Sequence, residues 1–231
     1  MREIVLDTET TGLDHRNGDR LVEIGCVEIL NHIPSGETWH EYFNPERDMP
    51  TAAFEVHGLS EEFLSDKPLF ETLADDFLKF IGDATLVIHN ASFDIGFLNA
   101  ELGRIGKQPL LMDRVVDTLA IARRKHPGSP ANLDALCRRY DIDLSARTKH
   151  GALLDSEILA QVYAELTGGR QADLGLENRM TRSSSRARGQ QKASVRPEPL
   201  APLITDDELA AHREFIKSLG DEAIWNKYDQ D

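Results

Sequence analysis

The sequence has little cysteine, few aromatic residues and no long apolar run. Aromatic residues make up 6% of the 231 residues, but hydrophobic residues make up 40%, which is enough for a folded core. Cys26 and Cys137 lie far apart and in no C-x-x-C spacing, which argues against a disulfide scaffold or a zinc finger and favours a reducing compartment. No apolar run reaches the roughly 18 residues of a membrane helix. Acidic residues also follow the first apolar residues too soon for a signal peptide. We therefore expect a soluble, cytoplasmic protein with no membrane partner.

Positive charge is also scarce. The chain carries 40 acidic and 26 basic residues, a formal net charge of −14. Such a surface repels phosphates on average, so bulk electrostatics cannot hold a nucleic acid. Residues 1–168 hold 29 acids and 16 bases, residues 169–196 hold 2 and 7, and residues 197–231 hold 9 and 3. The basic segment has few large apolar groups, which predicts a flexible linker over 169–203 between a folded domain (1–168) and a tail (204–231).

Hydrophobic periodicity predicts an α/β domain with a mixed sheet. Three strands, spaced for consecutive antiparallel pairing, precede alternating strands and helices. Phe70, Leu73 and Phe77 recur at helical spacing after Pro68, a residue suited to the first position of a helix. The expected strands are 4–10, 21–30, 36–43, 85–89 and 115–116, and the expected helices are 70–81, 93–105, 118–125, 132–140 and 151–167.

The most informative segment is Asp7-Thr8-Glu9. Side chains alternate along a strand, so Asp7 and Glu9 project from the same face. Two carboxylates roughly 7 Å apart on a buried strand repel each other and are costly to desolvate, and a divalent cation resolves both problems. On this motif alone, a second interpretation stays open, in which Asp7 caps a turn and Glu9 lies on the surface.

Two further acids, Asp94 and Asp155, face the core sides of their expected helices. Asp94 shares a helical face with Phe97, although the helix dipole also favours an acid in a first turn. Asp155 begins an i, i+3, i+4 stripe with Ile158 and Leu159, where an apolar residue is expected. A charge at that position needs a partner, which is either a metal ion or an arginine in a buried ion pair.

His150 lies in the loop that enters the last helix of the domain. A lone loop histidine is usually solvated, but beside a metal site its near-neutral pKa suits a proton acceptor for an attacking water. Four carboxylates favour magnesium or manganese over zinc, because zinc prefers nitrogen and sulfur. Two divalent ions balance their four negative charges and stabilise the attacking and leaving oxygens of a phosphoryl transfer. Such a site recruits a phosphodiester locally, despite the acidic surface.

Three segments resemble the motifs of the DEDD exonuclease superfamily, histidine subclass: Asp7-Thr8-Glu9, His89 to Asp94 (HNASFD) and His150 with Asp155. The resemblance implies an RNase H-like fold and a two-metal 3′→5′ exonuclease. It is closer still to the proofreading subunits of bacterial replicative polymerases, in DTETTG, VHGLS, VIHNASFDIGF, LDALCRRY and HGALLDSEILAQVY, which run through most of residues 1–168. This implies removal of mispaired nucleotides from the primer 3′ end of DNA as 5′-monophosphates.

The resemblance also assigns roles to single residues. His150 would be the general base that takes a proton from the attacking water, and Glu9 would also accept a hydrogen bond from the terminal 3′-hydroxyl. The ligands of two Mg²⁺ or Mn²⁺ ions would be Asp7, Glu9, Asp94 and Asp155. The pocket for the last nucleotide would be lined by Leu13, Val56, His57, Asn90 and Phe93. By their residue types alone, Val56 and Phe93 also suit a core, and Leu13 and His57 a surface loop.

The segment Gln171-Ala172-Asp173-Leu174-Gly175-Leu176 directly follows the domain. In this position it resembles a sliding-clamp-binding peptide, with Leu174 and Leu176 in an apolar groove of the clamp and Gln171 fixing the register. A final leucine in place of phenylalanine indicates weak affinity. The alternative is a plain linker.

The tail opens with a capping box, in which Thr205 is the N-cap and Glu208 stands three residues later. A lone helix of about 15 residues is marginal in water, so the tail needs a partner or a domain to fold against. It resembles the tail that binds the polymerase catalytic (alpha) subunit, with apolar contacts from Leu209, Phe215, Ile216 and Trp225. The alternative is a helix that folds back on residues 1–168.

Other functions stay open at this point. A free-standing RNA-trimming exonuclease of the same superfamily has no evident use for the clamp-like peptide and the tail. A non-catalytic scaffold has no reason to keep clustered acids at their cost in desolvation. A metal-dependent phosphoesterase for small nucleotides is not excluded by the motifs.

Overall fold

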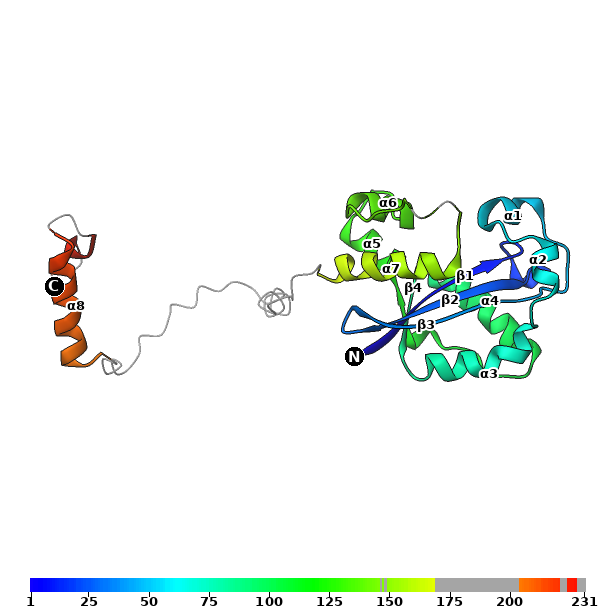
Figure 1. The fold of residues 1–231 in the computed structure, drawn as a ribbon, viewed down its shortest axis with the longest axis horizontal. Coiled ribbons are helices and arrows are strands. Elements are labelled where there is room, and N and C mark those ends of the chain that lie inside the picture. The colour runs from blue at the N-terminus through cyan, green and yellow to red at the C-terminus, as the bar shows by residue number, and fades with distance from the viewer. Residues whose placement is uncertain (146, 148, 169–203, 221–223, 228–231) are drawn as a thin grey trace, which may run out of the picture. The chain divides into compact units, whose positions relative to one another are not determined.

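The computed structural model describes residues 1–145, 147, 149–168, 204–220 and 224–227 (Figure 1). It divides the chain into two compact units, Met1–Leu176 and Glu177–Asp231. The expected linker, 169–203, and the clamp-like peptide, 171–176, lie outside the described residues. No helix of the described residues is long and apolar enough to cross a membrane.

A five-stranded mixed sheet in the order β3-β2-β1-β4-β5 forms the centre of the first unit. β1, β2 and β3 pair antiparallel in sequence, and β4 and β5 continue the sheet in parallel with β1. This arrangement confirms the predicted mixed sheet. The strands are β1 (Arg2–Thr10), β2 (Leu21–Leu30), β3 (Ile33–Tyr42), β4 (Thr85–Ile88) and β5 (Val115–Asp117).

Helices cover both faces of the sheet. In Figure 1, α5, α6 and α7 lie on one side and α3 and α4 on the other, while α1 and α2 lie near the end where β1 stops. The helices of this unit are α1 (Thr51–His57), α2 (Glu61–Ser65), α3 (Phe70–Ile81), α4 (Ala91–Arg104), α5 (Thr118–Lys125), α6 (Leu133–Arg139) and α7 (Ala152–Thr167), with short 3₁₀ turns η1 (His15–Asn17) and η2 (Met112–Arg114).

The predicted elements agree with the structure in type and order, with two corrections. α3 begins at Phe70 with Leu69 as its N-cap, so Pro68 precedes the helix and is not its first residue. α1 and α2 were not predicted, because each has seven residues or fewer and no full helical period of apolar residues.

Alternation along β1 assigns its side chains to two different layers. Ile4 and Leu6 belong to the core cluster shared with α3 and α4, whereas Val5 packs in the cluster that includes Leu159 of α7. Because side chains alternate with a period of two, the residues that continue the Val5 face toward the end of the strand are Asp7 and Glu9. The two acids therefore lie on the face that α7 covers.

The second unit contains α8 (Asp206–Ser218) and the 3₁₀ turn η4 (Ile224–Lys227). The capping box predicted at its start is present: Thr205 accepts from the Glu208 N–H, and the Glu208 carboxylate accepts from the Thr205 N–H. The His212 and Trp225 rings pack edge to face at 5.6 Å, so α8 and η4 contact each other.

Candidate active site

A glycine in β2 lets the start of α7 approach the sheet. Gly25 pairs with Asp7 across the β1–β2 ladder, and a Cβ atom at Gly25 would lie 2.2 Å from the backbone of Ala152 and Leu153. The Ser156 hydroxyl donates to the Gly25 carbonyl at 2.9 Å. A glycine inside a strand often marks such a close backbone approach. This contact places the first turn of α7, which carries Asp155, over the acidic face of β1.

Asp94 reaches the same site from the opposite layer. It lies in the first turn of α4, directly after β4, and its carboxylate accepts a hydrogen bond from the Thr8 hydroxyl at 2.7 Å. Thr8 projects from the face of β1 opposite to Asp7 and Glu9. The end of β1 is thus contacted from both layers, by Asp94 on one side and Asp155 on the other.

The electrostatics of the four carboxyl groups show that they are close together. Burial, followed by the charges of Asp94 and Glu9, holds the pKa of Asp7 well above its usual value. Burial also raises the pKa of Glu9 to about 8 and that of Asp94 to about 7. Clustered acids with pKa values raised by burial and mutual repulsion are typical of a site that needs bound cations.

Asp155 differs from the other three because an arginine neutralises it. Arg147 Nε and Nη2 donate to its two carboxylate oxygens at 2.5 and 2.6 Å, and Arg147 Nη1 binds Asp134 at the start of α6. Burial would raise the pKa of Asp155, but the hydrogen bonds with His150 and Arg147 outweigh it and lower the pKa. The buried ion pair considered from the sequence is therefore present, together with the acidic cluster.

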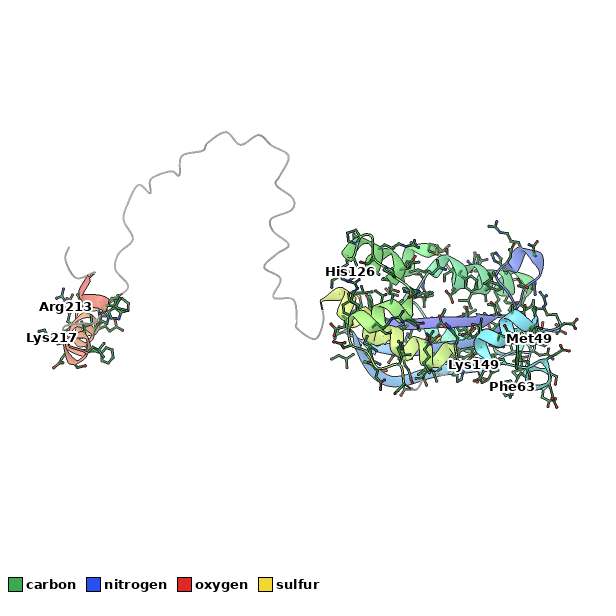
Figure 2. All side chains as sticks on the ribbon, turned by 90° about the horizontal axis from the view of Figure 1, so that it is seen from above. Met49, Phe63, His126, Lys149, Arg213 and Lys217 are labelled. Atoms are coloured by element: carbon green, nitrogen blue, oxygen red, sulfur yellow. The ribbon has the colours of Figure 1, made fainter. Side chains whose placement is uncertain are left out.

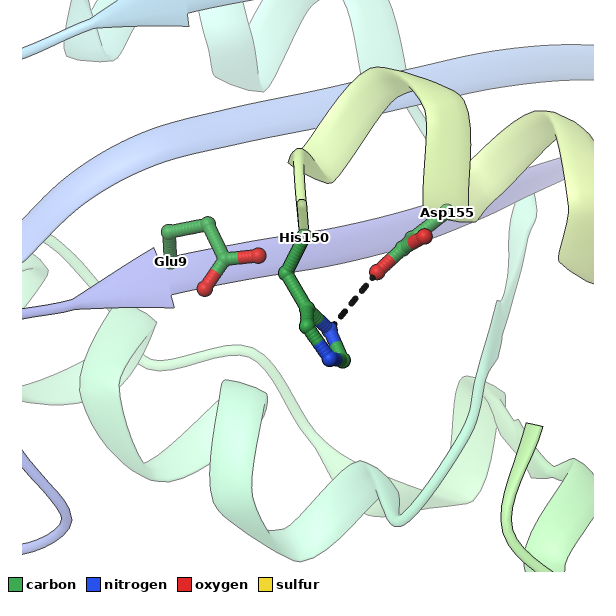
Figure 3. A group of neighbouring side chains, drawn as sticks. All are labelled: Glu9, His150 and Asp155. Atoms are coloured by element: carbon green, nitrogen blue, oxygen red, sulfur yellow. Dashed lines mark hydrogen bonds and ion pairs between the residues drawn. The ribbon is translucent and has the colours of Figure 1, made fainter. Parts of the chain in front are cut away.

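His150 lies beside two of the acids. Its Nδ1 lies 3.2 Å from Asp155 Oδ2 and 2.8 Å from Arg147 Nη2. Figure 3 shows the imidazole between the carboxyl groups of Glu9 and Asp155. One potential ligand atom from each of these three residues lies within 4.8 Å of the other two. The side chain of His150 is 47% exposed, so a water molecule can reach it.

These residues fit a divalent metal ion. Carboxylate oxygens from β1, α4 and α7 converge with few cations to neutralise them, and hard divalent ions prefer oxygen ligands. Of the five residues that the sequence indicated for chemistry, Glu9, His150 and Asp155 present potential ligand atoms within 4.8 Å of one another. Asp7 and Asp94 lie close enough to these acids that the charges of Asp94, Glu9 and Asp155 raise the pKa of Asp7.

A pocket of about 470 Å³ opens next to Glu9. Its wall is formed by the end of β1, by α1 and by the first turn of α4. Of the residues expected to hold the terminal nucleotide, the pocket is lined by Glu9, Leu13, Val56, His57 and Phe93. The Leu13 side chain is 85% exposed, as expected for a residue that is free to cover a ligand. His57 is buried, and burial lowers its pKa, which favours the neutral ring.

Asn90 is placed differently from the other expected pocket residues. It lines a neighbouring hollow of about 650 Å³ with Arg123 and Asn132. Its backbone is left-handed, with φ 67° and ψ 50°, at the N-cap of α4. Asparagine tolerates this conformation better than most residues, which gives Asn90 a structural role besides any contact with substrate.

Several residues of the site were not indicated by the sequence. Glu23 pairs with Glu9 across the β1–β2 ladder and is held by His40, whose Nε2 lies 2.7 Å away. Thr8, Gly25 and Arg147 also belong to this group. For Gly25 the signal was available, since it is a lone glycine in a strand of β-forming residues. Arg147 lies in a polar loop without periodicity, so nothing in the pattern distinguished it.

Comparison with known proteins agrees with this geometry. Residues 4–163 match the exonuclease family RNase_T. The DNA polymerase III subunit epsilon of Rickettsia felis is 49% identical over 222 residues, covering 95% of this chain and 97% of that protein. The Escherichia coli subunit of the same name is 41% identical over 235 residues, covering 97% of each chain. The chain belongs to the exonuclease family of DNA polymerase III epsilon subunits.

Members of this family are metal-dependent 3′→5′ exonucleases, and this chain is one of them. Solved structures agree in fold. Exonuclease X in complex with 5′ overhanging duplex DNA superposes with a TM-score of 0.55 at 25% identity, covering 71% of this chain and 90% of that one. The nuclease domain of 3′hExo, a DEDDh family member bound to rAMP, superposes at 0.63 with 17% identity, covering 72% and 91%. The RNase H-like fold is therefore confirmed.

The residues expected to bind partners fall in two groups. In the second unit, Leu209, Phe215 and Trp225 are exposed, the last two by 60% and 54%, whereas Ile216 is buried. The clamp-peptide residues Gln171, Leu174 and Leu176 lie outside the described residues.

Proposed function

We propose that this exonuclease removes mispaired nucleotides from the primer 3′ end of DNA, releasing each as a 5′-monophosphate. The observation that carries the proposal is the convergence of Asp7, Glu9, Asp94 and Asp155 beside a pocket that has the dimensions of a small ligand site. The pocket adjoins Glu9, so a nucleotide seated there has its terminal phosphodiester next to the acidic cluster.

His150 acts as the general base in this mechanism. Arg147 Nη2 lies 2.8 Å from His150 Nδ1 and also binds the Asp155 carboxylate, so the arginine orients the imidazole beside the acids. An imidazole in this position can accept the proton of the attacking water. Glu9 accepts a hydrogen bond from the terminal 3′-hydroxyl and so marks the end of the strand.

Asp7, Glu9, Asp94 and Asp155 would hold two divalent ions, Mg²⁺ or Mn²⁺. Two such ions match the four negative charges, and when bound they supply electrostatic stabilisation of the phosphoryl transfer. Ions held by these four carboxylates would also attract the phosphodiester, which the net charge of −14 would otherwise repel.

The proposal is tested by degradation of a 3′-mismatched primer, compared with a paired primer and a short RNA, with and without chelator. We expect metal-dependent release of deoxynucleoside 5′-monophosphates, fastest from the mismatched end. Asp7→Ala should abolish release while the protein stays folded. Asp75→Ala, which removes an exposed acid of α3, is the matched control and should keep full activity. Faster release from RNA than from DNA would instead support an RNA-trimming enzyme.

The tail would dock this exonuclease on the polymerase catalytic (alpha) subunit. Two observations support it. Phe215 on the capped helix α8 and Trp225 in the 3₁₀ turn η4 are exposed apolar side chains, and the similarity to the epsilon subunits extends beyond the exonuclease match at 4–163 to nearly the full chain. Phe215→Ala combined with Trp225→Ala should stop co-purification with that subunit and leave cleavage of free oligonucleotides unchanged. Retained co-purification would contradict the assignment.

The peptide 171–176 would bind the sliding clamp. An extended segment can insert alternate apolar side chains into a groove. Binding of the clamp through this peptide would also raise the effective concentration of the enzyme at the primer end. Leu174→Ala combined with Leu176→Ala should weaken retention on immobilised clamp without changing the rate on free oligonucleotides. We also propose that the protein acts in the cytoplasm of a bacterium, where replicating DNA lies.

A further inference from the structure

The C-terminal end of α1 binds the loop that carries His150. Lys149 Nζ donates to the Glu55 carbonyl at 3.0 Å and to the Phe54 carbonyl at 3.5 Å. The His150 N–H donates to the next carbonyl, that of Val56, at 3.3 Å. The C-terminal end of a helix carries partial negative charge and attracts a cation, so Lys149 occupies a favourable site for its charge.

The structure also provides space for the Lys149 side chain. Gly58, which ends α1 with φ +77°, would place a Cβ atom 2.8 Å from Lys149 Cδ. Any larger residue at Gly58 would therefore collide with the lysine stem. Lys149 Nζ also lies 5.4 Å from the centroid of the Phe54 ring, within the range of a cation–π contact. The lysine is thus held by backbone carbonyls and by an aromatic face, and its stem passes close to Gly58, where a Cβ atom would crowd it.

α1 is also a wall of the pocket proposed for the terminal nucleotide, through Ala53, Val56 and His57. The contacts of Lys149 and the His150 N–H therefore join the wall of the pocket to the loop of the general base. Figure 2 shows Lys149 toward the end of the unit that also carries Met49 and Phe63. Met49 lies just before α1, and Phe63 belongs to α2.

We propose that Lys149 is a positioning residue, which fixes His150 against the wall of the nucleotide pocket. The proposal rests on the proposed function, because it assigns Lys149 a part in the same hydrolysis. α1 also has its own anchor in the fold, because His57 at its end is buried, so loss of Lys149 frees the loop rather than the wall. The catalytic constant should then fall, while binding of the nucleotide and of the metal stays the same.

The test uses Lys149→Met in the full chain, with the p-nitrophenyl ester of thymidine 5′-monophosphate as substrate in Mn²⁺. We expect kcat to fall about tenfold, since small misplacements of a catalytic group are costly, with KM unchanged. The Mn²⁺ dissociation constant, measured by calorimetry, should also be unchanged, because no metal ligand lies in the loop before His150. Lys149→Arg should recover most of kcat, because a guanidinium retains the charge and the donors.

Lys125→Met is the matched control. Lys125 Nζ binds the Glu165 and Leu166 carbonyls at 3.0 and 3.1 Å, so it makes the same kind of contact at the C-terminal end of α7. Its neighbour His126 lies at the opposite end of the unit from Lys149 in Figure 2. The control should lose a comparable helix cap and keep the kcat of the unmodified protein.

The outcomes separate this inference from the proposed function. If the unmodified protein does not hydrolyse the ester in Mn²⁺, the proposed function fails. If it does, and Lys149→Met has the same kcat as Lys125→Met, the positioning role is wrong. A rise in KM at constant kcat would also overturn it. A structural role would also overturn the proposal. It would be indicated if Lys149→Met unfolded at a lower temperature than Lys125→Met and if Lys149→Arg did not recover the lost kcat.

Discussion

The guanidinium of Arg147 binds both carboxylate oxygens of Asp155, at 2.5 and 2.6 Å, and both side chains are almost fully buried. Asp155 is one of the proposed metal ligands, so the arginine supplies the positive charge that a metal ion would otherwise supply. Removing one partner of a buried ion pair leaves an uncompensated charge in the interior. The cost of losing Arg147 should therefore depend on whether metal is bound.

We predict that Arg147→Met destabilises the metal-free protein by about 3 kcal/mol. Thermal unfolding in EDTA should show the loss, and added Mn²⁺ should raise the unfolding temperature more in the variant than in the unmodified protein. Arg20→Met is the control, because Arg20 makes a similar two-bond pair with buried Glu101, at 2.7 and 3.0 Å. Its deficit should be the same with and without Mn²⁺. If Mn²⁺ raised the unfolding temperature equally in the two variants, Arg147 would not be replacing the charge of a metal ion at Asp155.

A second prediction concerns pH. In the folded, metal-free protein the pKa of Glu9 is raised to about 8 and that of Asp94 to about 7. The folded state therefore holds protons that the unfolded chain releases near its ordinary pKa values of about 4. The contribution of these two groups to the free energy of unfolding is therefore greatest at acid pH. It is lost as pH rises from about 4 through 8, because the folded state binds more protons than the unfolded chain in that window.

Metal binding should show the opposite pH dependence. Carboxylates must be deprotonated to bind a cation, so Mn²⁺ affinity should rise between pH 6 and 8, with release of about one proton or more per protein at pH 7. Calorimetry in buffers of different ionisation enthalpy measures the number released. Glu9→Gln should release fewer protons than the unmodified protein. A release that is the same at pH 6.5 and pH 9 would show that the acids are not protonated in the metal-free state.

Periodicity predicted most of the fold. β2 and α5 have the predicted bounds to the residue, because each combines a clear pattern with a clear turn or cap. β3 begins three residues earlier than expected, at Ile33, since its first half is exposed and has no alternation to reveal it. α1 and α2 are too short for a period.

The acids of the site were predictable because each stands where its element should be apolar or faces a core. The residues that arrange them were not. Arg147 contacts Asp134, 13 residues earlier in the chain, and Asp155, eight residues later, and only the folded loop brings the three together. Lys149 binds carbonyls about 94 residues earlier in the chain. Local patterns carry no information on contacts of that kind.

A third prediction concerns Gly25. A Cβ atom there would lie 2.2 Å from the α7 backbone, so Gly25→Ala must push the start of α7 away from β2. We expect a loss of stability of about 1–3 kcal/mol, as for other overpacked sites. Displacement of Asp155 should also lower kcat by about 100-fold, because catalytic groups tolerate little misplacement. Thermal unfolding and ester hydrolysis in Mn²⁺ measure the two effects.

Gly103→Ala is the control for this substitution. Gly103 lies in α4, and a Cβ atom there would meet nothing within 4 Å. Alanine in a helix interior is favoured over glycine by roughly 0.5–1 kcal/mol, so this variant should be slightly more stable and fully active. If Gly25→Ala retained the activity of Gly103→Ala, the approach of α7 to β2 would not be what positions Asp155.

The last prediction separates two roles of Asn90. Its left-handed backbone, with φ 67°, favours glycine or asparagine, while its side chain lines the hollow beside the nucleotide pocket. Asn90→Ala should therefore lower stability by about 1 kcal/mol, and Asn90→Gly should not. If the amide also contacts the DNA strand, both variants should raise KM for an oligonucleotide about fivefold, the effect of one lost hydrogen bond. A KM that rises only in Asn90→Ala would show that the backbone conformation alone explains the residue, and that the substrate contact expected for Asn90 is absent.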